Sequence, residues 1–316
     1  MNVIFDQHGT ADAAIYARLA ASQKAGKAAP FDVTDAGFIP QGELVNMWVH
    51  LGSQAIPNMK LVSPAFVREN LHQAVPYRGS EVVLAYNSAT VKNPPRTLGQ
   101  LVKWIEANPG KFDYCNPADG GSGDAFVQAV ALMGVKAGVV KELQNQAQYN
   151  PKLESAWSKN LQFLASLGKD MYRNGFYAGG NTQILQLLAQ GAIQMATVWS
   201  DQSTAALKAG QLPKSIKLIQ LKVPFYGSAV PLAIPKNSAH VKAAEAFVNW
   251  ILEPAQQQYI MRSISGFPGI DWRFLPAKAR RQFASVEAPY RSGIGSRYDA
   301  DLHADWQKIV AGAANG

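Results

Sequence analysis

The stretch 112–133, FDYCNPADGGSGDAFVQAVALM, contains the residues of this chain best suited to hold a polar ligand. Its pattern predicts a short strand, a turn of small residues and then an amphipathic helix. A helix that begins in this way leaves backbone N–H groups unpaired, and such groups bind anions or polar atoms. Ser122 and Asp124 are candidate caps. An ordinary tight turn is the alternative interpretation. No P-loop sequence follows the turn, and Gly121 and Gly123 lack the third glycine of a dinucleotide fingerprint.

Other reactive residue types are too few or too dispersed to form a catalytic or metal centre. Cys115 is the single cysteine, which excludes an internal disulfide, and we expect a buried structural thiol there. Ser122 has no G-x-S-x-G context. The five histidines show no H-E-x-x-H or comparable spacing: His8, His50, His72, His240 and His303. The sequence therefore predicts no metal, no cofactor and no catalysis.

Size and composition indicate a globular protein with two lobes. A chain of 316 residues exceeds the usual size of a single core and predicts lobes of roughly 100 to 200 residues. Hydrophobic residues make up 47% and charged residues 16%. The net charge of +8 is scattered, with Lys278, Arg280 and Arg281 as the densest group, so we expect no nucleic-acid partner. No apolar run reaches the ~18 residues of a membrane span, and the first ten residues lack the features of a secretion signal.

Strand and helix patterns alternate along the chain, which is typical of an α/β fold. Strands are predicted at 2–5, 30–38, 80–87, 192–199, 216–223 and 229–234. Helices are predicted at 11–21, 98–107, 157–167, 182–190, from 238, from 254, at 276–283 and at 301–310. Thr97 and Asn181 are the predicted N-caps of two of these helices.

Four segments, in this order, resemble the family 1 extracellular solute-binding proteins of ABC importers. They are GSEVVLAYNSATVKNPPRTLGQLVKWIEANPGKFDY, NPADGGSGDAF, GGNTQILQLLAQGAIQMATVWSDQ and PFYGSAVPLAIPKNSAHVKAAEAFVNWILEPAQQQYI. The resemblance covers roughly residues 30 to 316, and its nearest branch is the group of importers related to thiamine, polyamine and iron systems.

The resemblance implies a type II periplasmic-binding fold, in which two α/β lobes joined by a hinge hold a ligand in the cleft between them. Lobe 1 would comprise residues 1–86 and 228–262, and lobe 2 residues 87–227. Residues 263–316 would form a C-terminal helical tail packed on the lobes. Cleft closure would signal the bound state to the membrane permease. Family members begin with a secretion signal and a first strand, and the sequence predicts that this chain lacks both.

The resemblance also suggests which residues contact the ligand. The candidates lie where strands end and helices begin, positions that suit ligand contact in α/β folds. They are the helix start Gly121, Ser122, Gly123 and Asp124, the cap Asn181 with Thr182, the strand exit Trp199, Ser200 and Asp201, and the hinge residues Tyr86, Asn87 and Tyr226. Helix capping or core packing remains the alternative role for Asn181 and for residues 199–201.

The charge of the ligand is left open by these residues. Trp199, Tyr226 and Asp201 would form an aromatic and carboxylate box for an organic cation such as a polyamine or a thiamine-like compound. The helix start at 121–124 would instead suit a phosphate or carboxylate ester. An iron site is disfavoured because an adjacent tyrosine pair is missing. The resemblance to the thiamine and polyamine systems favours the cation.

Three functions follow from the sequence. The first is a periplasmic, monomeric binding protein that delivers a small-molecule solute to ABC permease subunits without catalysis. The second is an enzyme on a two-lobed fold that uses Asp124 or Asp201 as acid or base. The third is a cytosolic effector-binding or nucleic-acid-interacting module, motivated by the net charge and the missing signal.

Overall fold

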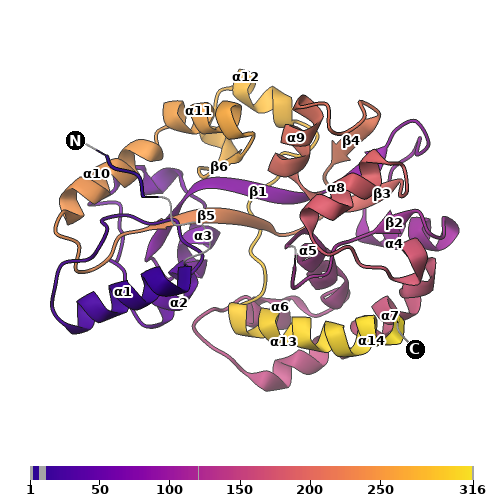
Figure 1. Ribbon diagram of the computed structural model, residues 1–316, viewed down its shortest axis with the longest axis horizontal. Helices are drawn as coiled ribbons and strands as arrows, with labels where there is room; N and C mark the ends of the chain where they lie inside the picture. The colour runs from indigo at the N-terminus through magenta and orange to yellow at the C-terminus, as the bar shows by residue number, and fades with distance from the viewer. Residues whose placement is uncertain (1–2, 7–11, 120, 315–316) are drawn as a thin grey trace. The chain divides into compact units, whose positions relative to one another are not determined.

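Strand β1, Ala74–Asn87, is the longest strand of the protein and organises its six-stranded sheet (Figure 1). The structure is a computed structural model that describes residues 3–6, 12–119 and 121–314. The chain divides into two units, each with its own core. Unit 1 comprises Met1–Gly79, Ala229–Ser263 and Phe267–Ala279, and unit 2 comprises Ser80–Ser228, Ile264–Gly266 and Arg280–Gly316. The lobe boundaries expected from the family resemblance stay a prediction.

The sheet of unit 2 has the order β2-β3-β1-β4. Strand β3, Met195–Trp199, runs antiparallel to β1 with Val82 opposite Trp199, and β4, Ile216–Ile219, pairs with the other edge of β1. Strand β2, Phe112–Asp113, lies parallel to β3. Side chains alternate between the two faces of a strand, so Val82 and Leu84 enter the main core while Glu81 points to the opposite face.

Helices surround this sheet in unit 2. They are α4 Leu98–Ala107, α5 Gly121–Ala131, α6 Ala137–Leu143, α7 Ser155–Leu167, α8 Asn181–Ala189, α9 Ser200–Lys208, α13 Ser296–Trp306 and α14 Gly312–Ala314. Short 3₁₀ turns occupy Pro151–Glu154, Gly168–Asp170, Tyr172–Asn174 and Arg281–Phe283, and a π-helical turn, Gln307–Ala311, follows α13. Figure 1 shows α13, in yellow, lying close to α6 and α7, far from them in sequence.

Helix α13 is part of the core of unit 2. Trp306 is buried and donates its indole N–H to the Tyr114 hydroxyl at 2.9 Å. Trp157 of α7 is likewise buried and donates to Asp305 Oδ2 at 2.9 Å. Buried aromatic side chains remove large apolar areas from water, and their polar tips need a partner. The last helices therefore hold the aromatic core of unit 2 together.

Unit 1 has a smaller core around Trp48. Its helices are α1 Asp12–Lys24, α2 Ile39–Leu44, α3 Pro64–Glu69, α10 Val241–Ile251, α11 Pro254–Ile264 and α12 Ala277–Arg280, with 3₁₀ turns at Pro57–Leu61 and Trp272–Phe274. Strand β5, Gly227–Ala233, pairs with β1, and β6, Phe267–Pro268, pairs with it at Gly79 and Arg78. Trp48 donates its indole N–H to the Ile39 carbonyl at 3.0 Å, and it packs so closely that a Cβ at Gly42 would lie 2.5 Å from it.

Most predicted elements are confirmed, with corrections at their ends. Thr97 is the predicted N-cap of α4, and its hydroxyl accepts the Gln100 N–H at 3.2 Å. The strand predicted at 80–87 begins earlier, at Ala74. Strands predicted at 2–5 and 30–38 are wrong for the residues described, because 3–6 have no regular structure and only Thr34 makes an isolated bridge. His8 and residue 2 lie outside the described residues.

Candidate functional site

The start of α5 touches two neighbouring segments and depends on glycine to do so. A Cβ at Gly123 would lie 1.7 Å from the Cys115 carbonyl oxygen, and one at Gly121 would lie 2.8 Å from Trp199 Cζ2. Real side chains do not approach a backbone atom this closely, so only glycine fits at Gly123. The glycine pattern singled out in the sequence thus brings the helix start against Trp199 at the exit of β3.

Two backbone N–H groups at this helix start already donate hydrogen bonds to protein atoms. Ser122 is buried and donates its hydroxyl to Asn181 Oδ1 at 2.8 Å, and its N–H lies 3.4 Å from the same oxygen. The Gly123 N–H donates to Cys115 Sγ at 3.2 Å. Cys115 is buried, as predicted, and burial raises the pKa of its thiol. Two of the N–H groups that would hold an anion are therefore already hydrogen-bonded.

Asn181 is not the N-cap that its sequence context predicts. Gly180 occupies the cap position of α8, with a positive φ of 132°, and Asn181 is the first helical residue. Its amide oxygen turns to Ser122 of α5 and ties the two helix starts together. Thr182 beside it is exposed. Ser122 and Asp124 are likewise inside α5 rather than before it, and their side chains bind other elements.

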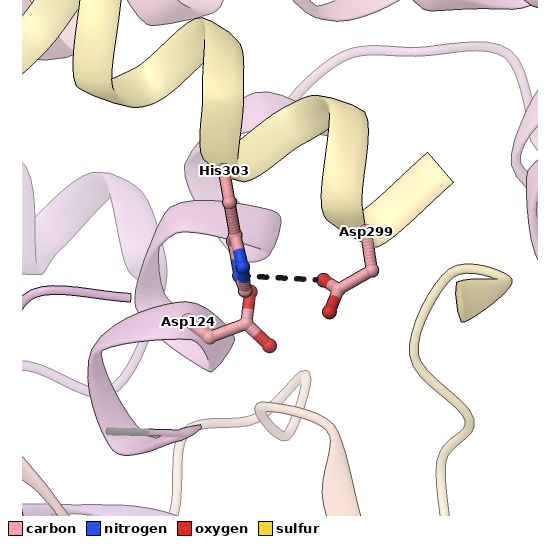
Figure 2. Close-up of side chains that lie close together, drawn as sticks. All are labelled: Asp124, Asp299 and His303. Atoms are coloured by element: carbon pink, nitrogen blue, oxygen red, sulfur yellow. Dashed lines mark hydrogen bonds and ion pairs between the residues drawn. The ribbon is translucent and has the colours of Figure 1, made fainter. Parts of the chain in front are cut away.

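Asp124 lies at the centre of a network between α5 and α13 (Figure 2). Its side chain accepts hydrogen bonds from the Tyr226 hydroxyl and from Gln128 Nε2, and His303 Nε2 lies 3.0 Å from its Oδ1. Figure 2 shows Asp299 and His303 reaching from α13 toward it. His303 Nε2 is also 3.6 Å from Asp299 Oδ1, and Gln128 Nε2 donates to that oxygen at 2.7 Å.

Burial and neighbouring charges shift the pKa values of three groups in this network. Burial, and then the neighbouring Asp124 carboxylate, raise the pKa of Asp299 to about 7. Burial alone would lower the pKa of His303, but its hydrogen bond to Asp124 and the negative charges beside it raise it above its usual value. The Tyr226 pKa is also raised well above its usual value, chiefly by burial.

These three residues also have the composition of a metal-binding group. Asp124, Asp299 and His303 each offer one ligand atom, and the atoms lie within 4.8 Å of one another. Each side chain is hydrogen-bonded to others of the network, which accounts for their positions without an ion. These contacts join α13 to α5. No local pattern in the sequence indicates this contact, since His303 is far from Asp124 along the chain.

Two serines organise the exit of β3. Ser80 of β1 donates its hydroxyl to Asp201 Oδ1 at 2.6 Å, and its oxygen lies 3.2 Å from Ser200 Oγ. The Glu81 backbone N–H donates to Ser200 Oγ at 3.1 Å. Asp201 is only half-buried, and its Oδ1 also accepts the Gln202 N–H at 2.9 Å. Trp199, close by in the chain, is partly exposed beside Gly121. This arrangement holds the Asp201 carboxylate in the first turn of α9, two residues after Trp199.

The structure brings together most predicted site residues but separates two of them from the rest. Gly121 touches Trp199, and Asp124 in the same helical turn binds Tyr226, so the candidates on α5, at the exit of β3 and before β5 are neighbours. Tyr86 pairs with Met195, and Asn87 lies five residues beyond the Val82–Trp199 pair, roughly 16 Å along the strand. Asn87 Oδ1 instead accepts the Ala89 N–H of the following turn at 3.0 Å. Tyr86 and Asn87 therefore do not lie beside Trp199 and Asp201.

Sequence reasoning missed Glu81. The residue is only 4% exposed, and no hydrogen bond to its buried Oε2 is found within residues 3–6, 12–119 and 121–314. Burial raises its pKa well above the usual value for glutamate. A Cβ at Gly227 would lie 2.7 Å from the Glu81 carboxyl carbon, so the carboxyl group occupies the space that this glycine leaves. An acidic residue inside the apolar run SEVVLAYN was the available signal.

Comparison with known proteins identifies the family. Residues 4–277 match the family of bacterial extracellular solute-binding proteins, and the chain belongs to that family. Protein YnjB of Escherichia coli is 23% identical over 244 residues, a match that covers 74% of this chain and 62% of YnjB. The matched region thus spans under two thirds of the length of that relative.

Solved structures share the fold. A candidate extracellular solute-binding protein from Bordetella parapertussis has a TM-score of 0.73 at 13% identity, over 95% of this chain and 87% of that one. An ABC transporter protein from Clostridium perfringens has a TM-score of 0.68 at 17% identity, over 94% and 88%. The spermidine/putrescine substrate-binding protein PotD of Streptococcus pneumoniae has 0.64 at 13%, over 96% and 89%. The protein therefore has the α/β fold of the periplasmic solute-binding proteins of ABC transporters. Among its described helices, none has the length and hydropathy of a membrane span.

Proposed function

We propose that this protein is the substrate-binding component of an ABC importer, and that it captures a small organic cation and delivers it to a membrane permease. Polyamines and thiamine-like compounds are the solute class that fits best. The observation that supports the cation is the exit of β3, where Ser80 holds the half-buried carboxylate of Asp201, two residues after the partly exposed Trp199. A carboxylate and an aromatic face together favour an ammonium group, and a cation–π contact contributes ~0.5 to 2 kcal/mol.

The anionic alternative has less support from the same residues. The N–H groups of Ser122 and Gly123 already donate to Asn181 and to Cys115, so the helix start offers fewer donors to a phosphate than its sequence suggests. The pneumococcal PotD is named as a spermidine/putrescine binding protein. That name favours an organic cation, as the Asp201 carboxylate does. At 13% identity it indicates a class to test first and does not determine the solute.

We propose further that the bound solute is released unchanged, that the protein acts as a monomer in the periplasm, and that it uses no cofactor and no nucleic acid. The acid or base of an enzyme needs a carboxylate within reach of a substrate. Asp124 is instead held by Tyr226, Gln128 and His303 inside unit 2. Recovery of the solute after long incubation, analysed by mass spectrometry, tests this; a converted product contradicts it.

The direct test is a thermal-shift screen with putrescine, spermidine, thiamine, amino acids, inorganic phosphate and sugar phosphates. A solute at about 100 times its dissociation constant stabilises the folded protein by about 2.7 kcal/mol, which shifts the melting temperature measurably. We expect a cation to give the shift and the phosphates to give none. A shift with phosphates alone would replace the cation by the anion at the start of α5.

Asp201→Asn tests the assigned carboxylate. The amide keeps the shape of the side chain and an oxygen for the Ser80 hydroxyl, but it removes the charge. Loss of a charged hydrogen bond of about 1.5–3 kcal/mol weakens cation binding by roughly 10- to 150-fold, measured by isothermal titration calorimetry. Asp119→Asn, which changes an exposed carboxylate of the turn before α5, is the control and should bind like the wild type. Equal affinity of Asp201→Asn and wild type would remove Asp201 from the site.

A further inference from the structure

Tyr226, one of the candidate solute contacts, lies at the end of a chain of hydrogen bonds that begins on α13. Its hydroxyl donates to Asp124 of α5, and Asp124 also contacts Gln128 and His303. Burial raises the pKa of Tyr226 well above its usual value, so the hydroxyl keeps its proton and acts as the donor. The ring is only partly buried. Because a hydroxyl has one hydrogen, and Asp124 takes it, the ring is the part of Tyr226 that remains for a cation.

Gln128 holds the Asp124 carboxylate in a defined orientation. The residue is 4% exposed, and its Oε1 accepts the Ile294 backbone N–H at 3.1 Å. Since a backbone N–H can only donate, the oxygen and nitrogen of this amide cannot be exchanged. Its Nε2 therefore faces the carboxylates, 3.2 Å from Asp124 Oδ2 and 2.7 Å from Asp299 Oδ1.

His303 approaches the same carboxylate from α13. Its Nε2 lies 3.0 Å from Asp124 Oδ1 and 3.6 Å from Asp299 Oδ1 (Figure 2). A ring nitrogen that faces two carboxylate oxygens carries a hydrogen, because a lone pair there would be repelled by both. Asp124 thus accepts hydrogen bonds from three side chains, and one of them belongs to α13. The direction of this carboxylate, and with it the place of the Tyr226 hydroxyl, depends on His303.

A tyrosine held in this way is prepared to bind a cation. A cation is attracted to the face of an aromatic ring, so the direction of that face decides the strength of the contact. A ring that is already fixed loses little conformational freedom when the solute binds. Donation of the hydroxyl hydrogen to a carboxylate also polarises the phenol toward its oxygen and ring. The same hydroxyl has no second hydrogen to offer an anion.

We propose that His303 is a positioning residue of the solute site, which acts through Asp124 to hold the ring of Tyr226 against an ammonium group of the solute. This inference rests on the proposed cation-binding function and names residues that prepare the site for it. Gln128 supports the same carboxylate from within α5. Helix α13 then contributes to binding as well as to the core of unit 2.

Two substitutions at His303 separate its hydrogen bond from its charge. His303→Phe keeps a ring but has no donor for Asp124, whereas His303→Gln returns an N–H donor to about the place of Nε2. Both variants lack the imidazole, so the difference between them isolates the hydrogen bond. Isothermal titration calorimetry with spermidine and with putrescine should show that His303→Phe binds roughly three- to tenfold more weakly than His303→Gln. Tyr226→Phe, which removes the hydroxyl and leaves α13 unchanged, should bind more weakly than the wild type by a similar factor.

Asp305→Ala is the matched control on the same helix. Asp305 accepts the Trp157 indole N–H at 2.9 Å, so its loss weakens the packing of α13 without touching Asp124. This variant should melt at a lower temperature than the wild type and bind spermidine normally. A purely structural role of His303 predicts instead that both variants lose affinity in proportion to their loss of stability.

The Tyr226 hydroxyl can be followed without a solute. In protein labelled with tyrosine carrying ¹³C at Cζ, the resonance missing from Tyr226→Phe belongs to Tyr226, and its chemical shift reports the hydrogen bond of the hydroxyl. We expect this resonance to move in His303→Phe, to return toward the wild-type position in His303→Gln and to stay in place in Asp305→Ala.

The outcomes distinguish this inference from the proposed function. If the wild type binds a polyamine and His303→Phe binds it as tightly as His303→Gln, the inference is wrong and the cation-binding function stands. Equal losses of affinity in His303→Phe and Asp305→Ala would reduce His303 to a stabilising residue. Tyr226→Phe is informative even if His303→Phe does not fold, and wild-type affinity there would overturn the inference. If the wild type binds no polyamine and no thiamine, the proposed function and the inference fail together.

Discussion

Gly123→Ala is expected to destabilise unit 2 by about 1–3 kcal/mol or more and to abolish solute binding. The added methyl group would lie 1.7 Å from the Cys115 carbonyl oxygen and 2.7 Å from its carbon, and both atoms belong to the backbone. A backbone atom cannot rotate away, so the first turn of α5 must shift, and overpacking with backbone movement costs about 1–3 kcal/mol or more. The shift would also displace Gly121 from Trp199. Urea denaturation and calorimetry with spermidine measure the two effects.

Gly99→Ala is the matched control for this substitution. Gly99 lies in α4 of the same unit, and a Cβ there meets no atom within 4 Å. Alanine in an exposed helix is more favourable than glycine by about 0.5–1 kcal/mol, so this variant should be slightly more stable than the wild type and should bind normally. If Gly123→Ala behaves like Gly99→Ala, the close contact between α5 and Cys115 does not exist.

The stability of unit 1 is expected to fall as the pH rises, because the buried Glu43 holds a proton in the folded state. Burial, and then the charge of Glu69, raise the Glu43 pKa from 4.5 to about 8. The folded state thus binds this proton more tightly than the unfolded state. The stabilisation is complete below pH 4.5 and is lost as the pH rises through 8. Since one pKa unit corresponds to about 1.4 kcal/mol, the loss has a ceiling on the order of 5 kcal/mol.

Glu43→Gln should remove this part of the pH dependence. The variant has no charge to bury, so its midpoint of urea denaturation at pH 9 should exceed that of the wild type, while the two should be similar at pH 5. Glu245→Gln on α10, a more exposed position of the same unit, is the control and should keep the wild-type profile. A Glu43→Gln variant that loses stability equally at pH 5 and pH 9 would mean that Glu43 makes a specific contact instead.

Local sequence patterns predicted most helices and strands. The arrangement of the candidate site residues depends on contacts between residues far apart in the chain, which these patterns do not describe. Thr97 caps its helix because the hydroxyl and the N–H it binds are three residues apart, which the sequence displays. Asn181 has the same local signal, but its oxygen binds Ser122, a partner 59 residues away. Capping preferences describe only neighbours in the chain, so a tertiary contact of this kind overrides them.

The same limit applies to the functional groups. The glycines at Gly121 and Gly123 were correctly singled out, since close backbone approach requires glycine wherever it occurs. The contact of Asp124 with His303, 179 residues later, depends on how α13 packs and has no local signal. Glu81 carried a signal, a charge inside an apolar strand. Its meaning depends on burial and on the absence of a described partner, which only the fold provides.

The packing of α13 has a consequence for the order in which the protein matures. Tyr114 is hydrogen-bonded to Trp306, 192 residues later in the chain, and Trp157 is hydrogen-bonded to Asp305, 148 residues later. A ribosome synthesises α13 long after Tyr114 and Trp157, so these aromatic side chains lack their partners until α13 has emerged. A chain arrested before α13 should be a substrate for chaperones and proteases, because the aromatic side chains that α13 and the following turn cover would be exposed.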